Sequence, residues 1–215
     1  MVIPTLNAGR TLAATLTAIG PVNEVVVADG GSTDDTVALA QNAGARVVVA
    51  PKGRGMQLGA GVAAATEDWL LLLHADTRLT PDWQAQARAH IEANPDKAAY
   101  FSLVLDSADP SARHLERLVA WRCRWLALPY GDQGLLIHRN VLQRAGGMRP
   151  LPLMEDVDLI RRLGRHRLVG LTAGAVTSAE KWESDGWYRR SGRNLLCLSL
   201  WFLGVPAGCI ARIYR

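Results

Sequence analysis

The first half of the chain alternates short apolar runs with longer segments of helical composition. The runs at 2–5, 24–30 and 45–50 are rich in β-branched residues, as strands are. The segments between them, 8–20 and 32–44, have helical composition, and the second begins with Ser, Thr and Asp and ends on a glycine. This order is typical of βαβ units and predicts an α/β fold around a mainly parallel sheet.

The apolar run at 69–73 continues this pattern and stops abruptly on His74, Ala75, Asp76 and Thr77. A continuous apolar run of this length is typical of a strand that is buried on both faces of a parallel sheet. In open α/β sheets, ligands bind just beyond the carboxyl ends of such strands. The pattern therefore predicts that His74 and Asp76 lie beside a ligand.

The second half of the chain has a looser order of elements. We expect helices at 80–94, 111–128 and 155–165 and strands at 98–106, 134–139 and 167–172, with the segment 140–147 and a Pro-rich turn before the last of these helices. From residue 180 onward, the pattern predicts two helices that are broken near Gly204 and Pro206. We therefore expect one α/β domain with a helical C-terminal appendage.

Composition and charge narrow the class of protein. The 215 residues are 49% hydrophobic and 20% charged, which is enough for one sizeable core. The net charge of +4 suits an anionic ligand, but Lys and Arg are dispersed and form no nucleic-acid motif, so no nucleic-acid partner is expected. Three cysteines without metal-ligand spacing, and an N-terminus without the basic region of a signal peptide, predict a cytoplasmic protein.

Two glycine-containing clusters at predicted strand ends suit phosphate groups. Asp29, Gly30 and Gly31 end a strand just before a helix, whose N-terminal N–H groups favour anions. Taken alone, this cluster is better explained as a tight turn with a helix cap. Lys52 and Arg54 lie in a glycine-rich turn and suit a diphosphate. A solvent-exposed turn that binds no ligand explains the same residues equally well.

Two acidic clusters suit metal binding and proton transfer. The Asp76 carboxylate can ligate Mg²⁺ or Mn²⁺, although a buried histidine and a helix-capping aspartate also account for His74 and Asp76. Glu155 and Asp156 begin a predicted helix, where acids complement the helix dipole. They also follow a Gly/Pro-rich loop that could aim one carboxylate into a cleft as a general base.

In their order along the chain, these clusters resemble the motifs of the family 2 glycosyltransferases. The matching segments are VIPTLN, ADGGSTDDT, GRGMQLGAG, LLLHADT and GGMRPLPLMED. The segments GDQGL, LPLMED and TSA…W are similar to those of a bacterial subgroup, the "transferase 2" proteins found beside radical-SAM and selenium-associated genes. The resemblance covers essentially the whole chain and implies the GT-A nucleotide-sugar transferase fold.

The resemblance implies an inverting transfer of a sugar from a nucleoside-diphosphate sugar to an acceptor hydroxyl, assisted by Mn²⁺ or Mg²⁺. It implies that Asp76 holds the metal, Asp156 is the general base and Glu155 positions the base or the acceptor. Asp132 and Gln133 would bind the transferred sugar. The other residues that it implies for donor binding are Pro4, Thr5, Asn7, Asp29, Gly30, Gly31, Lys52, Gly53, Arg54, Gly55, Gln57, His74 and Ala75.

The same resemblance divides the chain into functional parts. Residues 1–181 would form the transferase domain, with a nucleotide-binding half at 1–80 and an acceptor half at 81–181, and 182–215 would be the appendage. His74 departs from the family pattern because it stands where the first acid of Asp-x-Asp usually lies. Gly30 and Ala8 also stand at positions where many relatives have acids, so the sequence does not identify the nucleotide base.

Two other functions compete with this interpretation. A sugar-1-phosphate nucleotidyltransferase would have a basic glycine-rich loop directly after the first strand, where this chain has only Gly9 and Arg10. A non-catalytic relative that binds nucleotide sugars would explain His74, but it would not need Asp76 together with the acidic pair at 155–156. Both remain alternatives at this point.

The C-terminal appendage allows three interpretations. Its apolar run at 195–205 is shorter than the roughly 20 residues that a membrane span requires. Arginines flank its aromatic residues, which would suit peripheral contact with the inner face of a membrane and a lipid acceptor. Packing on the domain, or pairing across a homodimer, is the favoured explanation because such amphipathic helices usually face a core. The acceptor, lipid or small molecule, is not identified by the sequence.

Overall fold

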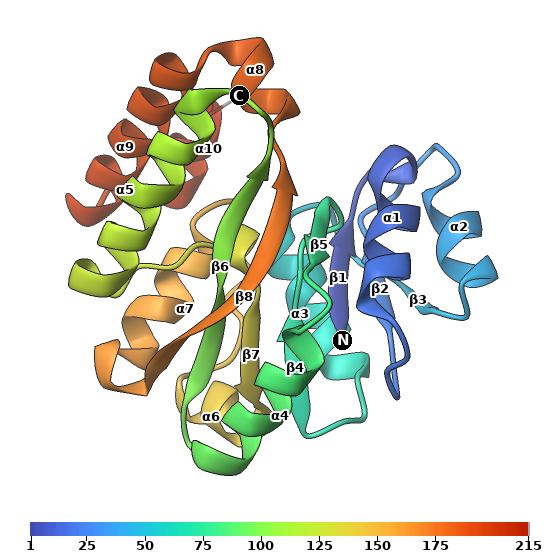
Figure 1. Cartoon of the computed structure of the whole chain (residues 1–215). Coiled ribbons are helices and arrows are strands. Elements are labelled where there is room, and N and C mark those ends of the chain that lie inside the picture. Colours follow the sequence, from blue (N-terminus) through green and yellow to red (C-terminus); the bar gives the residue numbers. More distant parts are fainter. Residues whose placement is uncertain (215) are drawn as a thin grey trace.

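The computed structural model describes residues 1–214 and shows one sheet with helices on both faces (Figure 1). Within this range the sheet has eight strands in the order β3-β2-β1-β4-β7-β6-β8-β5. The strands are β1 (Val2–Thr5), β2 (Val26–Asp29), β3 (Arg46–Val49), β4 (Trp69–Leu72), β5 (Thr77–Leu79), β6 (Ala98–Asp106), β7 (Leu135–His138) and β8 (Leu168–Ser178).

The sheet is mixed and mostly parallel. β1 pairs in parallel with β2 and β4, and β2 with β3, as the βαβ pattern predicted. β7 runs antiparallel to its neighbours β4 and β6, while β6 and β8 pair in parallel. The short strand β5 directly follows the 74–76 turn and lies antiparallel to β8, and the sequence pattern did not predict it.

The helices confirm most of the predicted segments. They are α1 (Gly9–Ile19), α2 (Thr36–Asn42), α3 (Arg54–Ala64), α4 (Trp83–Ala93), α5 (Pro110–Leu126), α6 (Arg139–Arg144), α7 (Glu155–Leu163), α8 (Glu180–Asp185), α9 (Trp187–Phe202) and α10 (Ala207–Tyr214), with 3₁₀ turns η1 (Gly131–Gln133) and η2 (Arg165–Arg167). The prediction of two C-terminal helices was wrong, since Gly186 adopts a φ of 84° and separates α8 from α9. None of these helices combines the length and the apolar character that crossing a membrane requires.

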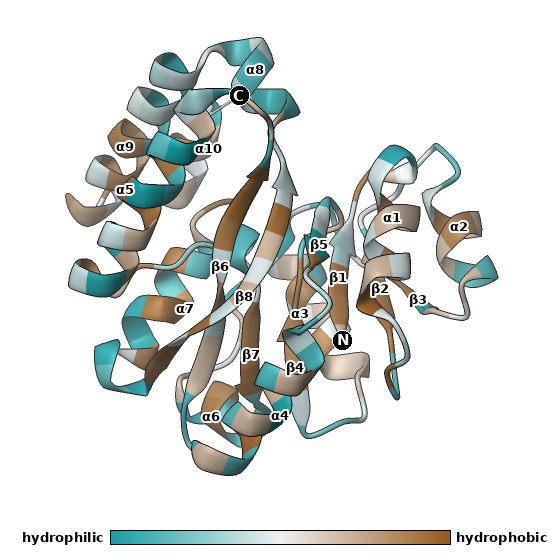
Figure 2. Cartoon of the chain, viewed as in Figure 1, coloured by the Kyte–Doolittle hydropathy of each residue, from teal (hydrophilic) through white to brown (hydrophobic). Residues whose placement is uncertain are grey.

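Two hydrophobic clusters cover the two faces of the sheet. Successive strand residues point to opposite faces, so Ile3 and Leu71 pack with α1 and α4, whereas Val2 and Leu70 pack with α3, α6 and α7. Figure 2 shows apolar residues concentrated along the central strands and on the helix sides that meet them. This double burial explains why β1, β2 and β4 are nearly continuous apolar runs.

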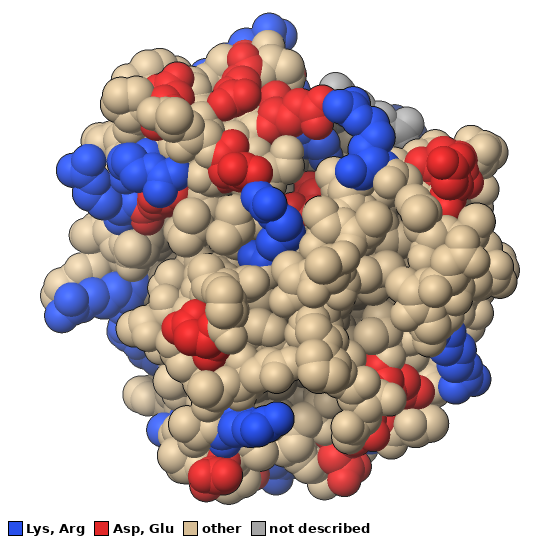
Figure 3. All heavy atoms as spheres, turned by 45° about the vertical axis from the view of Figure 1, so that its right-hand side comes forward, with Lys and Arg blue, Asp and Glu red and all other residues tan. Residues whose placement is uncertain are grey.

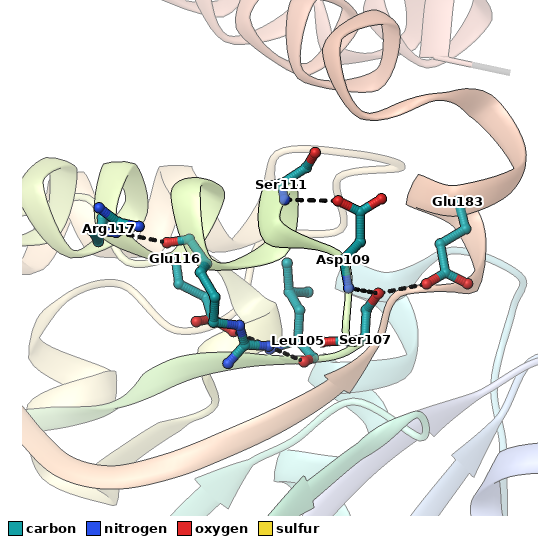
Figure 4. Close-up of polar contacts among 8 residues, drawn as sticks. Leu105, Ser107, Asp109, Ser111, Glu116, Arg117 and Glu183 are labelled. Carbon is teal, nitrogen blue, oxygen red and sulfur yellow. Dashed lines mark hydrogen bonds and ion pairs between the residues drawn. The ribbon is translucent and has the colours of Figure 1, made fainter.

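Polar contacts join the start of α5 to the end of β6 and to α8 (Figure 4). The Asp109 carboxylate accepts a hydrogen bond from the backbone N–H of Ser111 at 2.7 Å and so caps α5. The Ser107 hydroxyl donates to Glu183 at 2.6 Å. The Glu116 carboxylate accepts from the backbone N–H of Leu105, also at 2.6 Å. These bonds fix α5 against a third hydrophobic cluster of the core, in which Leu105 is buried.

The C-terminal helices pack on the domain. Cys197 of α9 and Ile210 of α10 are fully buried in a cluster with Leu153, which lies in the loop before α7. Met154 packs against the same cluster. α9 and α10 therefore hold the loop that leads to the acidic pair at 155–156, so the expected appendage forms part of the wall around the candidate site.

Candidate active site

A cleft of about 610 Å³ lies at the carboxyl ends of β1 and β4. It brings together many of the residues that the sequence predicted for donor binding: Pro4, Thr5, Asn7, Lys52, Gly53, Arg54, Gln57, His74, Ala75, Asp76 and Asp132. These residues come from segments far apart in the chain. Most of them meet because parallel strands have their carboxyl ends at one edge of the sheet. Asp132 reaches the same edge because β7, which it precedes, runs antiparallel to β4. Their contacts with a donor remain predictions.

Asp29 shapes the turn that follows β2. Its buried carboxylate accepts hydrogen bonds from the Thr5 hydroxyl at 2.9 Å and from the backbone N–H groups of Gly31 and Ser32 at 2.9 and 2.8 Å. Burial alone would raise the pKa of this carboxyl, but hydrogen bonds, above all from the Ser32 hydroxyl and then from the groups just named, outweigh burial and hold the pKa below its usual value. Asp29 is therefore ionised and oriented at neutral pH. It lies behind the residues that line the cleft.

Gln57 joins α3 to the ends of β1 and β2. Its buried amide donates to the carbonyl oxygens of Thr5 and Ala28. A Cβ atom at Gly30 would lie 2.9 Å from the Gln57 amide nitrogen, so Gly30 leaves room for this cross-link. Gly30 and Gly31 do not themselves line the cleft. Gln57 thus lines the cleft and also holds the ends of β1 and β2 in place beneath it.

Asn7 connects the loop after β1 to the loop after β2. Its backbone has a φ of 52°, a left-handed conformation that asparagine tolerates better than most residues. Its backbone N–H donates to the Ser32 hydroxyl at 2.8 Å, and its side-chain oxygen accepts from the backbone N–H of Thr33, also at 2.8 Å. The side chain thereby fixes the relative positions of two loops at the rim of the cleft.

The glycine-rich segment places two cations over the cleft and packs closely on the loop before α7. Lys52 and Arg54 both line the cleft, while Gly53 has a φ of 137° that favours glycine. Gly55 does not line the cleft. A Cβ atom there would lie 2.5 Å from the carbonyl oxygen of Arg149 and 2.7 Å from that of Leu151. Gly55 therefore allows α3 to touch the 149–151 loop.

His74, Gly131 and Asp156 meet where the cleft continues into a smaller chamber. The backbone N–H of Gly131 donates to Asp156 Oδ2 at 2.7 Å, and a Cβ atom on Gly131 would lie 2.6 Å from His74 Nε2. Burial, and then the nearby Arg54 cation, lower the pKa of His74 to about 4. The imidazole is therefore neutral at neutral pH, and the one ring nitrogen without a proton can accept a hydrogen bond or bind a metal.

Glu155 is the most deeply buried acid of the site, with 2% of its surface exposed. Oε1 lies 3.7 Å from Arg54 Nε, and buried Oε2 has no hydrogen-bond partner among residues 1–214. Burial, followed by the charge of Asp156, raises the pKa of Glu155 to about 7. Met154, which precedes it, adopts a left-handed φ of 65°, and this turn directs the pair at 155–156 toward the chamber.

The two polar residues of η1 have different surroundings. Asp132 lines the cleft, and its buried Oδ1 has no partner within residues 1–214. Burial raises the pKa of Asp132 to about 6. Gln133 points into the protein, where its amide donates to the Phe101 carbonyl oxygen at 2.9 Å and its Oε1 accepts from the backbone N–H of Tyr130 at 3.3 Å. Gln133 does not line the cleft, so contact with the sugar has no support from this arrangement.

The chamber beside the cleft has a volume of about 100 Å³. It lies between the acidic pair at 155–156 and the C-terminal helices, and Asn194, Cys197 and Tyr214 contribute to its wall. Sequence analysis missed these residues, as well as the cleft residues Arg10, Thr177, Ser178, Lys181, Trp182 and Arg190. The TSA…W segment was the available signal for Thr177 to Trp182, whereas nothing local indicated that α9 and α10 reach the site.

The cleft offers hard oxygen ligands to a divalent metal. Within residues 1–214, no three His, Cys, Asp or Glu side chains gather closely enough to enclose an ion. Asp76 nevertheless lines the cleft, and it shares the cleft with the unpartnered carboxylate oxygen of Asp132. Mg²⁺ and Mn²⁺ sites often use one or two carboxylates and complete the coordination with substrate phosphates. The residues present fit a metal that binds together with a diphosphate.

Comparison with known sequences supports the family. The model of "Glycosyl transferase family 2" matches residues 1–152. An uncharacterised glycosyltransferase of Mycobacterium tuberculosis is 43% identical over 77 residues, which cover 35% of each chain. A PGL/p-HBAD biosynthesis glycosyltransferase of Mycobacterium bovis is 34% identical over 122 residues, which cover 51% of this chain and 48% of the relative. The matches thus span about a third to half the length of these relatives.

Comparison with solved structures supports the fold. Glucosyl-3-phosphoglycerate synthase of Mycobacterium tuberculosis, in complex with Mn²⁺, UDP-glucose and glycerol 3-phosphate, superposes with a TM-score of 0.65. The superposition covers 95% of this chain and 79% of that chain, at 22% sequence identity. The complex of the same enzyme with Mn²⁺, UDP and glucosyl-3-phosphoglycerate gives a TM-score of 0.64. The fold is that of the GT-A transferases, and with the family model covering residues 1–152, the chain belongs to glycosyl transferase family 2.

Proposed function

We propose that this protein transfers a sugar from a nucleoside-diphosphate sugar to a hydroxyl group of an acceptor, with inversion at the anomeric carbon. The observation that carries the proposal is the placement of the acidic pair at 155–156 beside a cleft that holds Asp76 and two cations. The cleft can bind an anionic donor, and the chamber offers carboxylates to a neutral hydroxyl. A nucleotidyltransferase would not require a carboxylate pair at this chamber.

The donor's diphosphate would lie between Lys52, Arg54 and Asp76. The two cations attract the phosphates directly, and Asp76 would hold the metal. When bound, Mn²⁺ or Mg²⁺ supplies positive charge that stabilises the departing diphosphate. The ordered loops around Asn7 and Asp29 would bind the nucleoside, because they form the rim and support of the cleft next to β1 and β2.

Asp156 is the proposed proton acceptor for the attacking hydroxyl. Its Oδ2 accepts from the Gly131 backbone N–H and its Oδ1 from the Val157 backbone N–H at 2.7 Å, so the carboxylate has a fixed orientation. As the acceptor oxygen bonds to the anomeric carbon, its proton passes to Asp156 while the bond from that carbon to the diphosphate breaks. Glu155 and Arg54 would hold Asp156 and the acceptor in place.

Glu155 is the second candidate for the base, and one observation favours it. Its pKa is raised to about 7, which is close to the pH at which a general base works best. Its Oε2 also has no partner among the described residues, so it is free to accept a proton from a substrate in the chamber. Separate Asp156→Asn and Glu155→Gln variants distinguish the two assignments.

The relatives suggest the class of donor and acceptor. The structurally similar synthase binds UDP-glucose with Mn²⁺ and has been captured with phosphoglyceric acid, so a UDP-sugar and a small hydroxyl-bearing acceptor are reasonable first substrates to test. The segments GDQGL, LPLMED and TSA…W support placement in the radical-SAM-associated and selenium-associated subgroup, which we include in the proposal. Asp132 would contact the transferred sugar from the floor of the cleft.

A ligand-stability experiment tests the proposal. UDP, GDP, dTDP and CDP, each with and without Mn²⁺, are added to the protein, and the melting temperature is followed because ligands that bind the native state raise it. We expect one diphosphate to raise the melting temperature only when Mn²⁺ is present. The matching nucleotide sugar should then release that diphosphate when an acceptor is added. Binding of a nucleoside triphosphate and a sugar phosphate, with release of pyrophosphate, would instead identify a nucleotidyltransferase.

A further inference from the structure

The outer side of α5 exposes large apolar side chains at helical spacing. Leu118, Trp121 and Trp125 are all more than half exposed, with Trp121 at 55% and Trp125 at 59%. The opposite side of the helix contributes Ala112, Val119 and Cys123 to the core. A helix normally buries one stripe, so a second apolar stripe facing outward requires a separate explanation.

α9 has the same organisation. Cys197 is buried, whereas Tyr188, Leu195, Leu196 and Phe202 are exposed on the outer side, and Leu203 follows the helix with 80% of its surface exposed. Tyr188, Leu195 and Phe202 recur every seven residues, and Leu196 and Leu203 do the same one position further on, which places both rows on one side of the helix. Asn194 and Cys197, on the inner side, line the chamber of the candidate site.

In the view of Figure 1, both helices lie on the left-hand side of the molecule, and Trp187 at the start of α9 packs against the hydrophobic cluster of α5. At their starts, Trp187 Nε1 donates to Asp109 at 3.0 Å. At the end of α5, Arg165 of η2 donates to the Trp125 carbonyl oxygen. At the end of α9, the guanidinium of Arg161 in α7 lies 4.7 Å from the centre of the Phe202 ring. We call their exposed sides together the basic-aromatic face. It consists of Leu118, Trp121, Trp125, Tyr188, Leu195, Leu196, Phe202 and Leu203 with Arg117, Arg124 and Arg189.

The charges on the basic-aromatic face have one sign. Arg117 and Arg124 are exposed on α5, and Arg189 is exposed on α9. The acid within α5, Glu116, is only 15% exposed and pairs with Arg113, and α9 contains no acid. In Figure 3, Lys and Arg are numerous at the left-hand margin of the molecule, where acidic atoms also appear, and the face turned to the viewer carries both signs. The apolar stripes are thus interleaved with cations that no exposed acid on either helix neutralises.

We propose that the basic-aromatic face docks on the surface of a lipid bilayer that contains anionic lipids. Tryptophan and tyrosine favour the boundary between headgroups and acyl chains, and arginine extends its guanidinium to the phosphates while its stem stays in apolar surroundings. Anionic headgroups attract the unpaired cations. The two helices would lie flat in the interface, with α9 between the bilayer and the chamber.

The same charges argue against a second copy of the chain as the occupant. In a two-fold symmetric dimer, a surface patch meets itself, so this face would place arginines opposite arginines with no acid between them. Like charges brought together at an interface are costly. A bilayer surface presents the opposite charge over its whole area, and it covers both apolar stripes at once.

Vesicle sedimentation tests this proposal without any assay of glycosyl transfer. The full-length protein is centrifuged with vesicles of phosphatidylcholine alone, or with vesicles that also contain phosphatidylglycerol, at low and at raised salt. We expect binding to the anionic vesicles only, with release by salt, because ions screen the attraction. Arg117→Glu with Arg124→Glu should weaken binding at least about tenfold, since each cation near such a surface contributes appreciably. Trp121→Ser with Trp125→Ser should also weaken it.

Matched substitutions elsewhere control for general effects of charge and hydrophobicity. Val49→Ser removes an apolar side chain that is 84% exposed on β3, and Arg88→Glu reverses an exposed charge on α4. Both variants should bind vesicles like the parent protein. Equal binding of parent protein and face variants, or no binding to anionic vesicles, would overturn the proposal. So would a concentration-dependent dimer that the Trp121 and Trp125 substitutions dissociate, because the face would then join two copies of the chain.

Discussion

The backbone N–H of Gly131 donates to Oδ2 of Asp156 at 2.7 Å, which joins the turn before β7 to the first residues of α7. The two residues are 25 positions apart in the sequence. This bond holds one carboxylate oxygen in place and directs the Asp156 side chain toward His74, whose Nε2 is near the same glycine. A carboxylate that is held by the backbone on one side and borders a chamber on the other is well placed to receive a proton.

Replacement of Asp156 by Asn should remove this proton acceptor and keep its shape. The amide oxygen of Asn can still accept from Gly131, while the Val157 N–H loses its acceptor, so we expect a slightly less stable but folded protein that binds nucleotide with unchanged affinity. Sugar transfer should fall at least about a hundredfold, the usual scale for a lost general base. Steady-state kinetics together with calorimetric nucleotide binding measure the two effects separately.

Asp158→Asn provides a matched control in the same helix. Asp158 is buried and pairs with Arg149 at 3.0 Å and with Arg162 at 2.7 Å, but it does not line the cleft or the chamber. We expect it to lower the free energy of unfolding by about 1–3 kcal/mol, because charged hydrogen bonds are lost, with little change in turnover of the folded protein. If Asp156→Asn retained full activity, Glu155 would become the favoured base.

Removal of the Asp76 carboxylate should abolish metal-dependent nucleotide binding. We expect Asp76→Ala to bind the diphosphate equally weakly with and without Mn²⁺, whereas the parent protein should bind much more tightly when Mn²⁺ is present. Glu92→Ala, which removes an exposed acid from α4, is the control and should behave like the parent. Calorimetry at fixed Mn²⁺ measures this difference. An undiminished Mn²⁺ effect in Asp76→Ala would place the metal elsewhere.

An acid at position 74 tests whether His74, which replaces the first acid of the family's Asp-x-Asp motif, weakens metal binding. His74→Asp would recreate the Asp-x-Asp pair and add a second hard ligand to the cleft. We expect tighter Mn²⁺ binding in this variant, measured by titration of the metal in the presence of the diphosphate. The melting temperature of the metal-free protein provides the control, since a large drop would indicate that His74 mainly supports the fold.

Most of the fold could be predicted from the sequence because its signals are local. Strands buried on both faces leave continuous apolar runs, and β1, β2 and β4 appear where such runs occur. The direction of β7 could not be predicted, since an apolar run does not specify whether its neighbour is parallel or antiparallel. β5 was missed because three residues are too few to show an alternation.

The candidate site could be predicted only in part, because residue types at strand ends do not reveal which way a side chain points. Lys52, Arg54 and Asp76 do face one cleft. Gln133 and Gly55 occur in segments that predicted contact with the donor or its sugar. Gln133 instead bonds to the Phe101 backbone, and Gly55 makes room for the 149–151 loop. The contribution of α9 and α10 depends on packing against Leu153, a long-range contact that no local pattern encodes.

Ionisation of Glu155 should make stability fall with rising pH. Its pKa in the folded protein is raised from 4.5 to about 7, so between these values the folded state binds more protons than the unfolded state. The stability that this group contributes is complete below its unfolded pKa and is lost as the pH rises through about 7. Glu155→Gln cannot ionise, so it should gain stability relative to the parent as the pH rises.

Urea unfolding of both proteins across this range measures the effect. We expect the difference in free energy of unfolding to change by on the order of 1–3 kcal/mol between about pH 5 and pH 8, in favour of the variant at the higher pH. Glu92→Gln, at an exposed position, should show no such change. A difference that stays constant with pH would mean that Glu155 is ionised over the whole range, and the ion pair with Arg54 would then dominate its environment.

Two glycines of α3 provide a matched test of how the site is assembled. A methyl group at Gly55 would meet backbone atoms of Arg149 and Leu151 at 2.5 to 2.8 Å, and backbone cannot move aside as a flexible side chain can. At Gly59 the nearest atom would be Met148 Cβ at 3.8 Å, an ordinary contact. We therefore expect Gly55→Ala to destabilise the protein by about 1–3 kcal/mol, as overpacking does.

Gly59→Ala should instead be neutral or stabilise by up to about 1 kcal/mol, because alanine favours a helix interior more than glycine does. The 149–151 loop leads to the acidic pair at 155–156, so displacement of the loop by Gly55→Ala should also slow sugar transfer in the fraction that remains folded. Chemical denaturation and turnover of both variants test this. Equal stability of the two would show that the loop yields easily, and the close approach at Gly55 would then have no role in positioning Glu155 and Asp156.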